Sequence, residues 1–316
     1  MKTIFFGTPE TAVPFLKLLA AKTEVVAVVS QPDKPSGRGL EVSPTPVKSA
    51  ALELGLRVLQ PTKPSEIAVE LKALRADFGV VVAYGRILKT DVLSSTKRGL
   101  LNAHFSLLPK CRGAAPVQWS LVRGENRTGV TLFWLDEGMD TGPVQAVCET
   151  DILADEDAPA LLSRLSGLGV ELLAATLSDL AAGKIVRRPQ EGAASVAPLI
   201  KREDARLDLS RPADELHRLV RGFRSWPRAW LELASGRVLV LKTEAASLSD
   251  AHAVGTPGVI LAIERGRGIL IECSSRSRLW FLEVQPEGKK PLNAAEFANG
   301  LRLTVGGILS LSGKTI

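Results

Sequence analysis

Three side chains that could assist the transfer of an acyl group stand near one another in this sequence. Asn102 and His104 lie in the string NAHFSLLPKCR at the end of one apolar run, and Asp140 follows a second apolar run, GVTLFWLD. An amide and a protonated imidazole can donate hydrogen bonds to a developing oxyanion, while a nearby carboxylate can keep the imidazole charged and accept protons through water. If the three meet at one crevice, they suit acyl transfer to a neutral amine.

A lone histidine at the end of a strand is usually a structural residue, so these residue types carry little weight by themselves. The common nucleotide and hydrolase motifs offer no other candidate. The turn GTPETAVP lacks the spaced glycines of a dinucleotide site, and KPSGRG lacks the Lys-Ser/Thr ending of a phosphate-binding loop. No Gly-x-Ser-x-Gly elbow and no His-Glu-x-x-His motif occurs. We therefore expect neither an NAD or ATP site nor a covalent nucleophile.

The elements that must position the three residues alternate between strands and helices. Four apolar runs are nearly continuous, as expected for strands buried on both faces, and cover residues 3–7, 24–30, 78–85 and 99–106. A helix is expected over 9–21, with Thr8 as its cap and Pro9 in its first position. This alternation predicts an α/β fold with a doubly wound, mostly parallel sheet, whose ligand crevice lies at the carboxyl ends of the strands. His104 stands at such an end.

The second half of the chain predicts a different kind of structure. A leucine-rich helix is expected over 156–182, ending at Gly183, and a short helix over 210–223 leaves Arg218 and Arg221 facing solvent. Short strands follow at 237–243, 258–264, 268–274 and 279–285, for which a small β-barrel is the economical packing. The predicted parts are a catalytic domain at 1–188, a linker at 189–206 and a smaller C-terminal β-barrel domain at 207–316.

The composition is that of an ordinary globular protein. The 316 residues, 45% of them hydrophobic, are enough for two domains. The opening MKTIFFGTPE is too short for a signal peptide, and no apolar run approaches the roughly 20 residues that span a bilayer. We therefore expect a cytoplasmic protein with no membrane partner. The three cysteines are far apart, which favours neither a disulfide framework nor a metal site.

The basic excess of the chain lies mostly in its C-terminal part. Residues 1–200 hold 22 Lys and Arg against 21 Asp and Glu, whereas residues 201–316 hold 18 against 13. Solvated surface charge is the commoner cause of so small an imbalance, but a polyanionic partner such as nucleic acid also fits it.

The string from Asn102 to Asp140 resembles the folate-dependent formyltransferases. NAHFSLLPKCRGAAPVQWSL, TGVT and DTG together match the pattern of asparagine, histidine two residues on, a Ser-Leu-Leu-Pro loop, Arg-Gly and a later aspartate. The resemblance implies a Rossmann-like formyltransferase domain in which Asn102, His104 and Asp140 are catalytic. It also implies 10-formyltetrahydrofolate as the formyl donor, with no metal. The residues it assigns to the donor are Ser106, Leu107, Leu108, Pro109, Tyr84, Arg86, Ile87 and Leu88, together with backbone of 137–140; Ile87 and Leu88 could equally be core residues.

The segment QPDKPSGRGLEVSPTPVK at 31–48 bears on the acceptor. In an arbitrary protein it would be a solvated loop. It resembles, however, the loop with which the members of the family that act on methionyl-tRNA reach the acceptor stem, with Lys34 exposed and Arg38 as the functional arginine. The C-terminal part resembles the appended OB-like, tRNA-contacting domain, where Arg218 and Arg221 are candidates. These likenesses imply initiator methionyl-tRNA as the partner, in translation initiation; we expect a monomer.

Several departures and alternatives remain open at this point. Leu40 and Glu41 follow Arg38 where lysines are frequent in the family, Cys111 replaces an aromatic residue and Phe105 replaces a small one, so the shapes of the folate pocket and of the loop are in doubt. The rival acceptors are an amino-sugar nucleotide and glycinamide ribonucleotide. Two alternative functions also remain: the protein could be a hydrolase that releases formate, or a non-catalytic RNA-binding protein.

Overall fold

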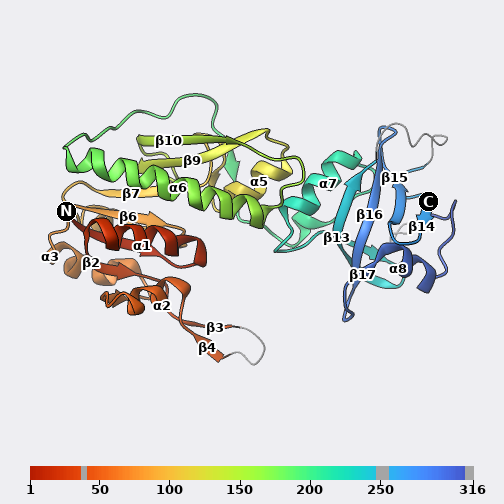
Figure 1. Ribbon diagram of the computed structural model, residues 1–316, viewed down its shortest axis with the longest axis horizontal. Helices are drawn as coiled ribbons and strands as arrows, with labels where there is room; N and C mark the ends of the chain where they lie inside the picture. The colour runs from red at the N-terminus through yellow and green to blue at the C-terminus, as the bar shows by residue number, and fades with distance from the viewer. Residues whose placement is uncertain (37–40, 247–255, 310–316) are drawn as a thin grey trace. The chain divides into compact units, whose positions relative to one another are not determined.

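The computed structural model describes residues 1–36, 41–246 and 256–309 (Figure 1). The chain divides into two compact units. The first contains Met1–Pro116, Arg127–Ile152 and Ala160–Leu199, and the second contains Val117–Asn126, Leu153–Pro159 and Ile200–Ile316. The main division therefore falls inside the expected linker, and two short segments of the expected catalytic domain belong to the second unit.

A seven-stranded sheet forms the centre of the first unit. Its strand order is β10-β9-β7-β6-β1-β2-β5; β9 pairs antiparallel with both of its neighbours, and all other pairs are parallel. The strands are β1 (Lys2–Gly7), β2 (Glu24–Val29), β5 (Val58–Leu59), β6 (Phe78–Val82), β7 (Leu100–His104), β9 (Arg127–Trp134) and β10 (Val144–Asp151). The doubly wound, mostly parallel sheet is thus confirmed, with antiparallel pairing at one edge.

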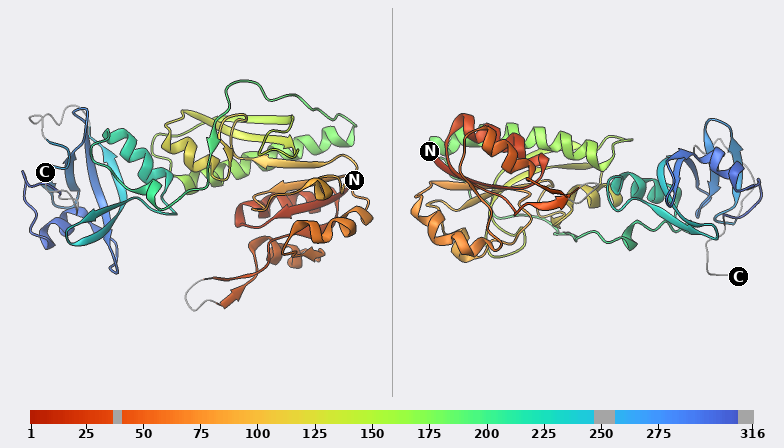
Figure 2. Two further views of the ribbon diagram at one scale, coloured as in Figure 1. Left: turned by 180° about the vertical axis from the view of Figure 1, so that it is seen from behind. Right: turned by 90° about the horizontal axis from the view of Figure 1, so that it is seen from below.

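Helices cover both faces of this sheet. Figure 2 shows α1 (Val13–Lys22) and α6 (Ala158–Ala181) on one face and α3 (Ala68–Ala73) on the other. Because side chains alternate along a strand, residues of β1 are buried on both faces of the sheet. Its Ile4 and Phe6 join the core cluster that contains Leu71 of α3, and Phe5 points to the opposite face. The remaining helical pieces of the unit are α2 (Pro46–Glu53), α4 (Thr90–Leu93) and turns at Glu10–Ala12 and Pro64–Ile67.

Two expectations about these helices are wrong. Thr8 does not cap the first helix; its hydroxyl instead donates to the carbonyl oxygen of Tyr84 at 3.0 Å, and Pro9 precedes a short 3-10 turn. The expectation that no apolar run is long enough to span a bilayer also fails, because α6 passes that test by length and composition. In this fold α6 packs on the sheet: Gly169 faces Phe15 of α1 and Val130 of β9, with no room for a Cβ at position 169.

The segment after α6 returns along the sheet and is part of the first unit. Trp134 Nε1 donates to the carbonyl oxygen of Val186 at 3.0 Å, and Val144 of β10 forms a bridge with Arg188. Further on, β11 (Val196–Ala197) pairs in parallel with β8 (Arg112–Gly113). Residues 189–199, expected to be linker, are therefore fixed beside the loop that follows His104.

The second unit is built on an antiparallel sheet of order β12-β13-β16-β15-β14, with β17 paired to β16. This sheet is consistent with the small barrel expected from the sequence. Its amphipathic helix α7 (Ala213–Gly222) buries Leu216, Leu219 and Val220. The strands are β12 (Trp230–Leu233), β13 (Gly236–Ala245), β14 (Ile260–Glu264), β15 (Gly268–Glu272), β16 (Arg278–Pro286) and β17 (Leu292–Asn293); α5 (Pro116–Val122) and α8 (Ala294–Gly300) are the other helices.

Candidate active site

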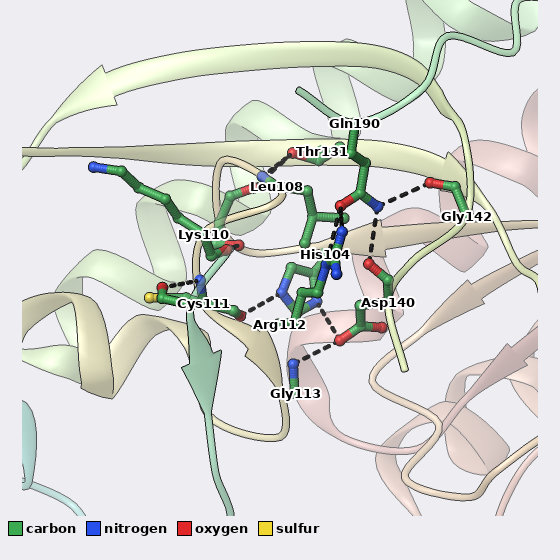
Figure 3. Close-up of polar contacts among 12 residues, drawn as sticks. His104, Leu108, Lys110, Cys111, Arg112, Gly113, Thr131, Asp140, Gly142 and Gln190 are labelled. Carbon is green, nitrogen blue, oxygen red and sulfur yellow. Dashed lines mark hydrogen bonds and ion pairs between the residues drawn. The ribbon is translucent and has the colours of Figure 1, made fainter. Parts of the chain in front are cut away.

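His104, the last residue of β7, is buried between two protein oxygens (Figure 3). Its Nε2 lies 2.9 Å from the carbonyl oxygen of Cys111, and its Nδ1 lies 3.6 Å from Oδ2 of Asp140. A carbonyl oxygen can only accept a hydrogen bond, so Nε2 carries a proton and donates it. Nδ1 is the nitrogen that remains to exchange a proton.

Burial lowers the pKa of His104 below its usual value of 6.5, and the Asp140 carboxylate and the Cys111 carbonyl offset this only in part. Burial therefore favours the neutral ring in the resting protein. The sequence predicts that Asp140 keeps His104 charged, whereas burial in this structure opposes the charged ring, because it removes the cation from water. The imidazolium is instead a state that a reaction would have to form.

A titration of the histidine ring signals by NMR tests this electrostatic balance. We expect the pKa of His104 to lie below 6.5, and to fall further in Asp140→Asn, because that change removes the carboxylate that raises it. The lowered pKa means that the folded state favours the neutral ring. The contribution of His104 to folding stability is therefore fully present above pH 6.5 and is lost as the pH falls through the folded-state pKa. A His104 pKa above 6.5, or a rise in Asp140→Asn, would contradict this account.

Asp140 is held in an unusual backbone conformation. Its φ is 55°, in the left-handed region that costs a non-glycine residue about 1–2 kcal/mol. Gly113 N–H donates to Oδ2 of Asp140 at 2.7 Å, and Gln190 Nε2 donates to the carbonyl oxygens of Asp140 at 2.8 Å and Gly142 at 2.9 Å. These contacts fix the carboxylate so that it faces His104 (Figure 3).

Asn102 lies two residues before His104 on β7, so the two side chains share one face of the sheet. It is half-buried, between Val81 of β6 and Phe133 of β9 in the register of the strands. Within the described ranges, no protein group forms a hydrogen bond with its side-chain amide. Its Nδ2 can therefore donate to a bound molecule without giving up an internal contact.

Together these three residues supply an amide donor, a neutral imidazole and a carboxylate. The imidazole can accept a proton at Nδ1 and would then be a cation flanked by the Cys111 carbonyl and the Asp140 carboxylate. Such a set can transfer an acyl group between two nitrogens with internal proton transfer. In the described part of the chain, His, Cys, Asp and Glu do not gather in groups of three that could hold a metal ion.

The loop after His104 is held by its own polar groups. Ser106 Oγ donates to the carbonyl oxygen of Lys110 at 2.6 Å, and Thr131 Oγ1 both donates to the carbonyl oxygen of Ser106 at 2.7 Å and accepts from Leu108 N–H at 3.1 Å. Ser106 and Pro109 are buried, whereas Leu107 and Leu108 are half-buried. The side chain of Ser106 thus points inward, and a role for this loop in donor binding stays a prediction.

The second loop assigned to the donor, residues 84–88, divides into two kinds of residue. Tyr84 and Leu88 belong to the core cluster, while Arg86 is exposed and Ile87 is 87% exposed. Thr90 Oγ1 donates to Glu137 Oε1 at 2.6 Å and so connects this loop to the one that carries Asp140. The alternative that these two are core residues is therefore right for Leu88 and wrong for Ile87, whose exposed side chain can contact a ligand.

Comparison with known proteins gives the family. Residues 1–177 match the model described as formyl transferase, and residues 199–302 match that of the formyl transferase C-terminal domain. Methionyl-tRNA formyltransferase of Elusimicrobium minutum is 45% identical over 98% of this chain and 99% of its own length. The enzyme of that name from Thermus thermophilus is 44% identical over 97% of this chain and 98% of its own. The chain belongs to the methionyl-tRNA formyltransferase family.

A solved structure has the same fold at lower identity. The N-formyltransferase of Helicobacter canadensis, in complex with folinic acid and dTDP-3-aminofucose, superposes with a TM-score of 0.68. The match covers 89% of this chain and 98% of that chain at 18% identity. The family resemblance and the two-part fold expected from the sequence are therefore both confirmed.

In this family member, the segment at 31–48 contains a β-hairpin where an irregular loop was expected. Strands β3 (Lys34–Ser36) and β4 (Glu41–Ser43) pair antiparallel, with Lys34 exposed at the base. Arg38 and Leu40 lie outside the described residues.

Polar contacts hold the base of the hairpin. Asp33 forms an ion pair with Lys48 and accepts from Gln60 Nε2 at 2.7 Å, and both contacts hold the pKa of the Asp33 carboxyl below its usual value. Gln31 Nε2 donates to the carbonyl oxygen of Tyr84 at 2.8 Å. The base of the hairpin is thus tied directly to the loop at 84–88.

Arg218 and Arg221 do not extend freely into solvent as expected. Arg218 Nη1 pairs with Asp214 at 2.5 Å, and its side chain is 24% exposed. Arg221 Nη1 donates to three backbone carbonyls of one loop, with the closest contact at Ala154. Burial lowers the pKa of Arg221. Both arginines therefore have structural partners within the second unit, and their contact with tRNA stays a prediction.

Two residues of the site could not be found by sequence reasoning. Arg112 Nε and Nη2 donate to Gln190 Oε1 at 3.1 and 2.6 Å, and the same Gln190 amide holds the backbone at Asp140. Gln190 lies in the segment 189–206 that the sequence predicts to be a linker, and a linker gives no signal of its contacts. Arg112 stands inside the matched motif, where its type alone says nothing of what it binds.

Proposed function

We propose that this protein transfers the formyl group of 10-formyltetrahydrofolate to the free amine of initiator methionyl-tRNA, giving formylmethionyl-tRNA for translation initiation. The observation that carries the proposal is the site at the end of β7. There, the amide of Asn102, which has no hydrogen-bond partner among the described residues, shares a sheet face with His104, whose Nδ1 lies 3.6 Å from Asp140. The near full-length identity to curated methionyl-tRNA formyltransferases supports this choice of acceptor and donor.

In the proposed reaction, the amine nitrogen attacks the formyl carbon, and the formyl oxygen becomes an oxyanion. Asn102 Nδ2 donates to that oxygen. The amine nitrogen must lose one proton as its new bond to carbon forms, and Nδ1 of the neutral His104 accepts that proton. The Asp140 carboxylate and the Cys111 carbonyl stabilise the imidazolium so formed, and its positive charge stabilises the oxyanion electrostatically.

Collapse of the intermediate completes the transfer. The bond between the formyl carbon and N10 of the folate breaks, and the proton held by His104 passes to N10. The products are the formylated amine and tetrahydrofolate, with no net change in protons. A neutral resting His104, as its burial implies, fits this cycle because the ring must accept a proton before it can donate one.

The donor is proposed to lie along the loops at 84–88 and 106–109. Backbone groups of Leu107, Leu108 and the segment around Glu137 are candidates to bind its pteridine ring, with the exposed side chain of Ile87 as an apolar contact. Phe105 is buried edge-on against Phe15 of α1, so this bulky side chain packs in the core.

The acceptor end of the tRNA is proposed to reach the site along the hairpin of β3 and β4. Lys34 on this hairpin, Arg38 of the sequence segment 31–48 and basic residues of the second unit would contact phosphates, which makes binding sensitive to salt and gives it little sequence specificity. A cytoplasmic location follows from the same proposal, because a charged initiator tRNA is used where translation starts; the monomeric state expected from the sequence stays a prediction.

The deciding experiment measures labelled formyl transfer from 10-formyltetrahydrofolate to initiator methionyl-tRNA. Uncharged initiator tRNA, elongator methionyl-tRNA and dTDP-3-aminofucose serve as parallel acceptors. Product on initiator methionyl-tRNA, with none on the sugar nucleotide or the uncharged tRNA, is the expected outcome. Product on the sugar alone would identify an amino-sugar enzyme, and formate without an acceptor product would identify a hydrolase. Salt-sensitive RNA binding with no folate turnover would identify a non-catalytic RNA-binding protein.

Replacement of Arg38 tests the hairpin. We expect Arg38→Ala to lower kcat/KM for methionyl-tRNA by about tenfold or more, because a phosphate or 3′-end contact is lost, while the Kd of the folate donor is unchanged. Lys22→Ala is a matched control, since it removes a positive charge from α1 of the same unit. The measurement is initial rates over a range of tRNA concentrations. An equal loss in folate binding would argue against a role confined to the acceptor.

A further inference from the structure

We infer that Gln190 is a positioning residue for the reaction, which holds the Asp140 carboxylate against His104 through the backbone of the Asp140 loop. The inference rests on the proposed function, because it concerns the same site. Gln190 lies in the extended segment after α6, far from Asp140 along the chain, and Figure 3 shows its amide directly above the Asp140 loop.

The orientation of the Gln190 amide is fixed by the chemistry of its partners. Its Nε2 donates to the carbonyl oxygens of Asp140 at 2.8 Å and Gly142 at 2.9 Å, which uses both of its hydrogens. Its Oε1 accepts from Nε and Nη2 of Arg112. Carbonyls only accept and a guanidinium only donates, so a flipped amide would lose all four contacts.

The contacts close a ring around Asp140. Arg112 and Gly113 are the two residues of β8, and they reach Asp140 by different routes. Gly113 N–H holds the carboxylate at 2.7 Å, and the Arg112 side chain holds the backbone through Gln190. The strand itself is fixed by its pairing with β11 and by Arg112 N–H, which donates to the carbonyl oxygen of Ser195 at 2.8 Å.

This ring explains how Asp140 keeps its left-handed backbone. A non-glycine residue at φ 55° persists only where its surroundings over-determine it, and Gln190 bonds the carbonyls on both sides of Thr141. Without Gln190 the loop is free to relax toward ordinary backbone angles. The carboxylate would then move away from Nδ1 of His104, and the imidazolium that the reaction forms would lose its counter-charge.

Three variants and a control test the inference. Gln190→Met keeps the size of the side chain and removes every hydrogen bond, and Gln190→Glu keeps an acceptor for Arg112 but has no hydrogens for the two carbonyls. Arg112→Lys keeps the charge and cannot make the two-pronged contact. Glu191→Ala changes the next residue, which is exposed and has no hydrogen-bond or ion-pair partner in the described part of the chain.

We expect kcat for formyl transfer to fall by about tenfold to a hundredfold in Gln190→Met and Gln190→Glu, the scale of a misplaced catalytic group. KM for folate and for methionyl-tRNA should stay within about twofold of the wild type. Arg112→Lys should lose less, and Glu191→Ala should match the wild type. In Gln190→Met the pKa of His104, followed by NMR, should fall as the carboxylate moves away, which loss of stability alone would not cause.

The outcomes separate this inference from the proposed function. If wild-type protein fails to transfer a formyl group, the proposed function is wrong. If the wild type is active and folded Gln190→Met or Gln190→Glu retains kcat within about twofold, the positioning role is overturned. A kcat loss with an unchanged His104 pKa overturns it as well. Should both Gln190 variants fail to fold, Arg112→Lys decides: unchanged kcat and His104 pKa overturn the role, and a fall in both supports it.

Discussion

Replacing Asn102 by alanine is expected to lower kcat for formyl transfer by about a hundred- to a thousandfold. The loss corresponds to about 3 to 4 kcal/mol, which is typical when one oxyanion donor is removed. The Asn102 amide has no internal hydrogen-bond partner in the described ranges. It can therefore donate a hydrogen bond to the formyl oxygen when that oxygen gains charge. Binding of tRNA should change little, because the hairpin and the second unit are untouched.

The measurement is a single-turnover rate with saturating donor and methionyl-tRNA, beside Kd values for both. Asn102→Asp is a stricter variant, because it keeps the shape and replaces the donor by an acceptor. Asn126→Ala is a matched control, since Asn126 is exposed and its side chain has no hydrogen-bond partner in the described part of the chain. An Asn102→Ala protein that turns over at a near-native rate would remove Asn102 from the mechanism.

Replacing Gly113 by alanine is expected to lower the free energy of unfolding of the first unit by about 3 kcal/mol or more. Two effects add at this position. The backbone has φ 118°, which suits glycine alone, and a Cβ would lie 2.6 Å from the carbonyl oxygen of Ala197. Because Gly113 N–H also holds the Asp140 carboxylate, the surviving folded protein should have a reduced kcat.

Gly192→Ala separates the two effects. Gly192 also has a positive φ, 100°, but open space surrounds the position of its Cβ. It should therefore show only the backbone strain, about 1 kcal/mol or slightly more. Urea unfolding followed by the signal of the first unit gives both values. Equal losses in the two variants would show that the close approach of β8 and β11 does not matter.

The central sheet and the site residues could be predicted because their signals are local. Strands buried on both faces read as continuous apolar runs, which located β1, β2, β6 and β7, and the strand-end rule placed His104 at the crevice. The motif then linked Asp140 to it. In the second unit, short apolar runs between turn residues located β13, β14, β15 and β16, whereas β12 and β17 were missed.

The supports of the site could not be predicted because they depend on contacts between distant segments. Gln190 reaches Asp140 only because the chain after α6 runs back along the sheet, and β8 and β11 have two residues each, too few for a periodic pattern. Thr8 was read as a cap because capping is the usual use of threonine before a helix, whereas here its hydroxyl binds Tyr84. The burial that opposes a charge on His104 is not visible in a sequence.

The pairing of β8 with β11 also sets the order in which the site is completed during synthesis. All seven strands of the sheet, His104 and Asp140 are translated before Gln190, Ser195 and Ala197. A nascent chain that ends before residue 190 has the three reacting side chains but lacks the segment that braces them. A polypeptide cut at residue 188, the end of the expected catalytic domain, would be in the same condition, because the contacts of Gln190 and the pairing of β11 with β8 lie beyond that residue.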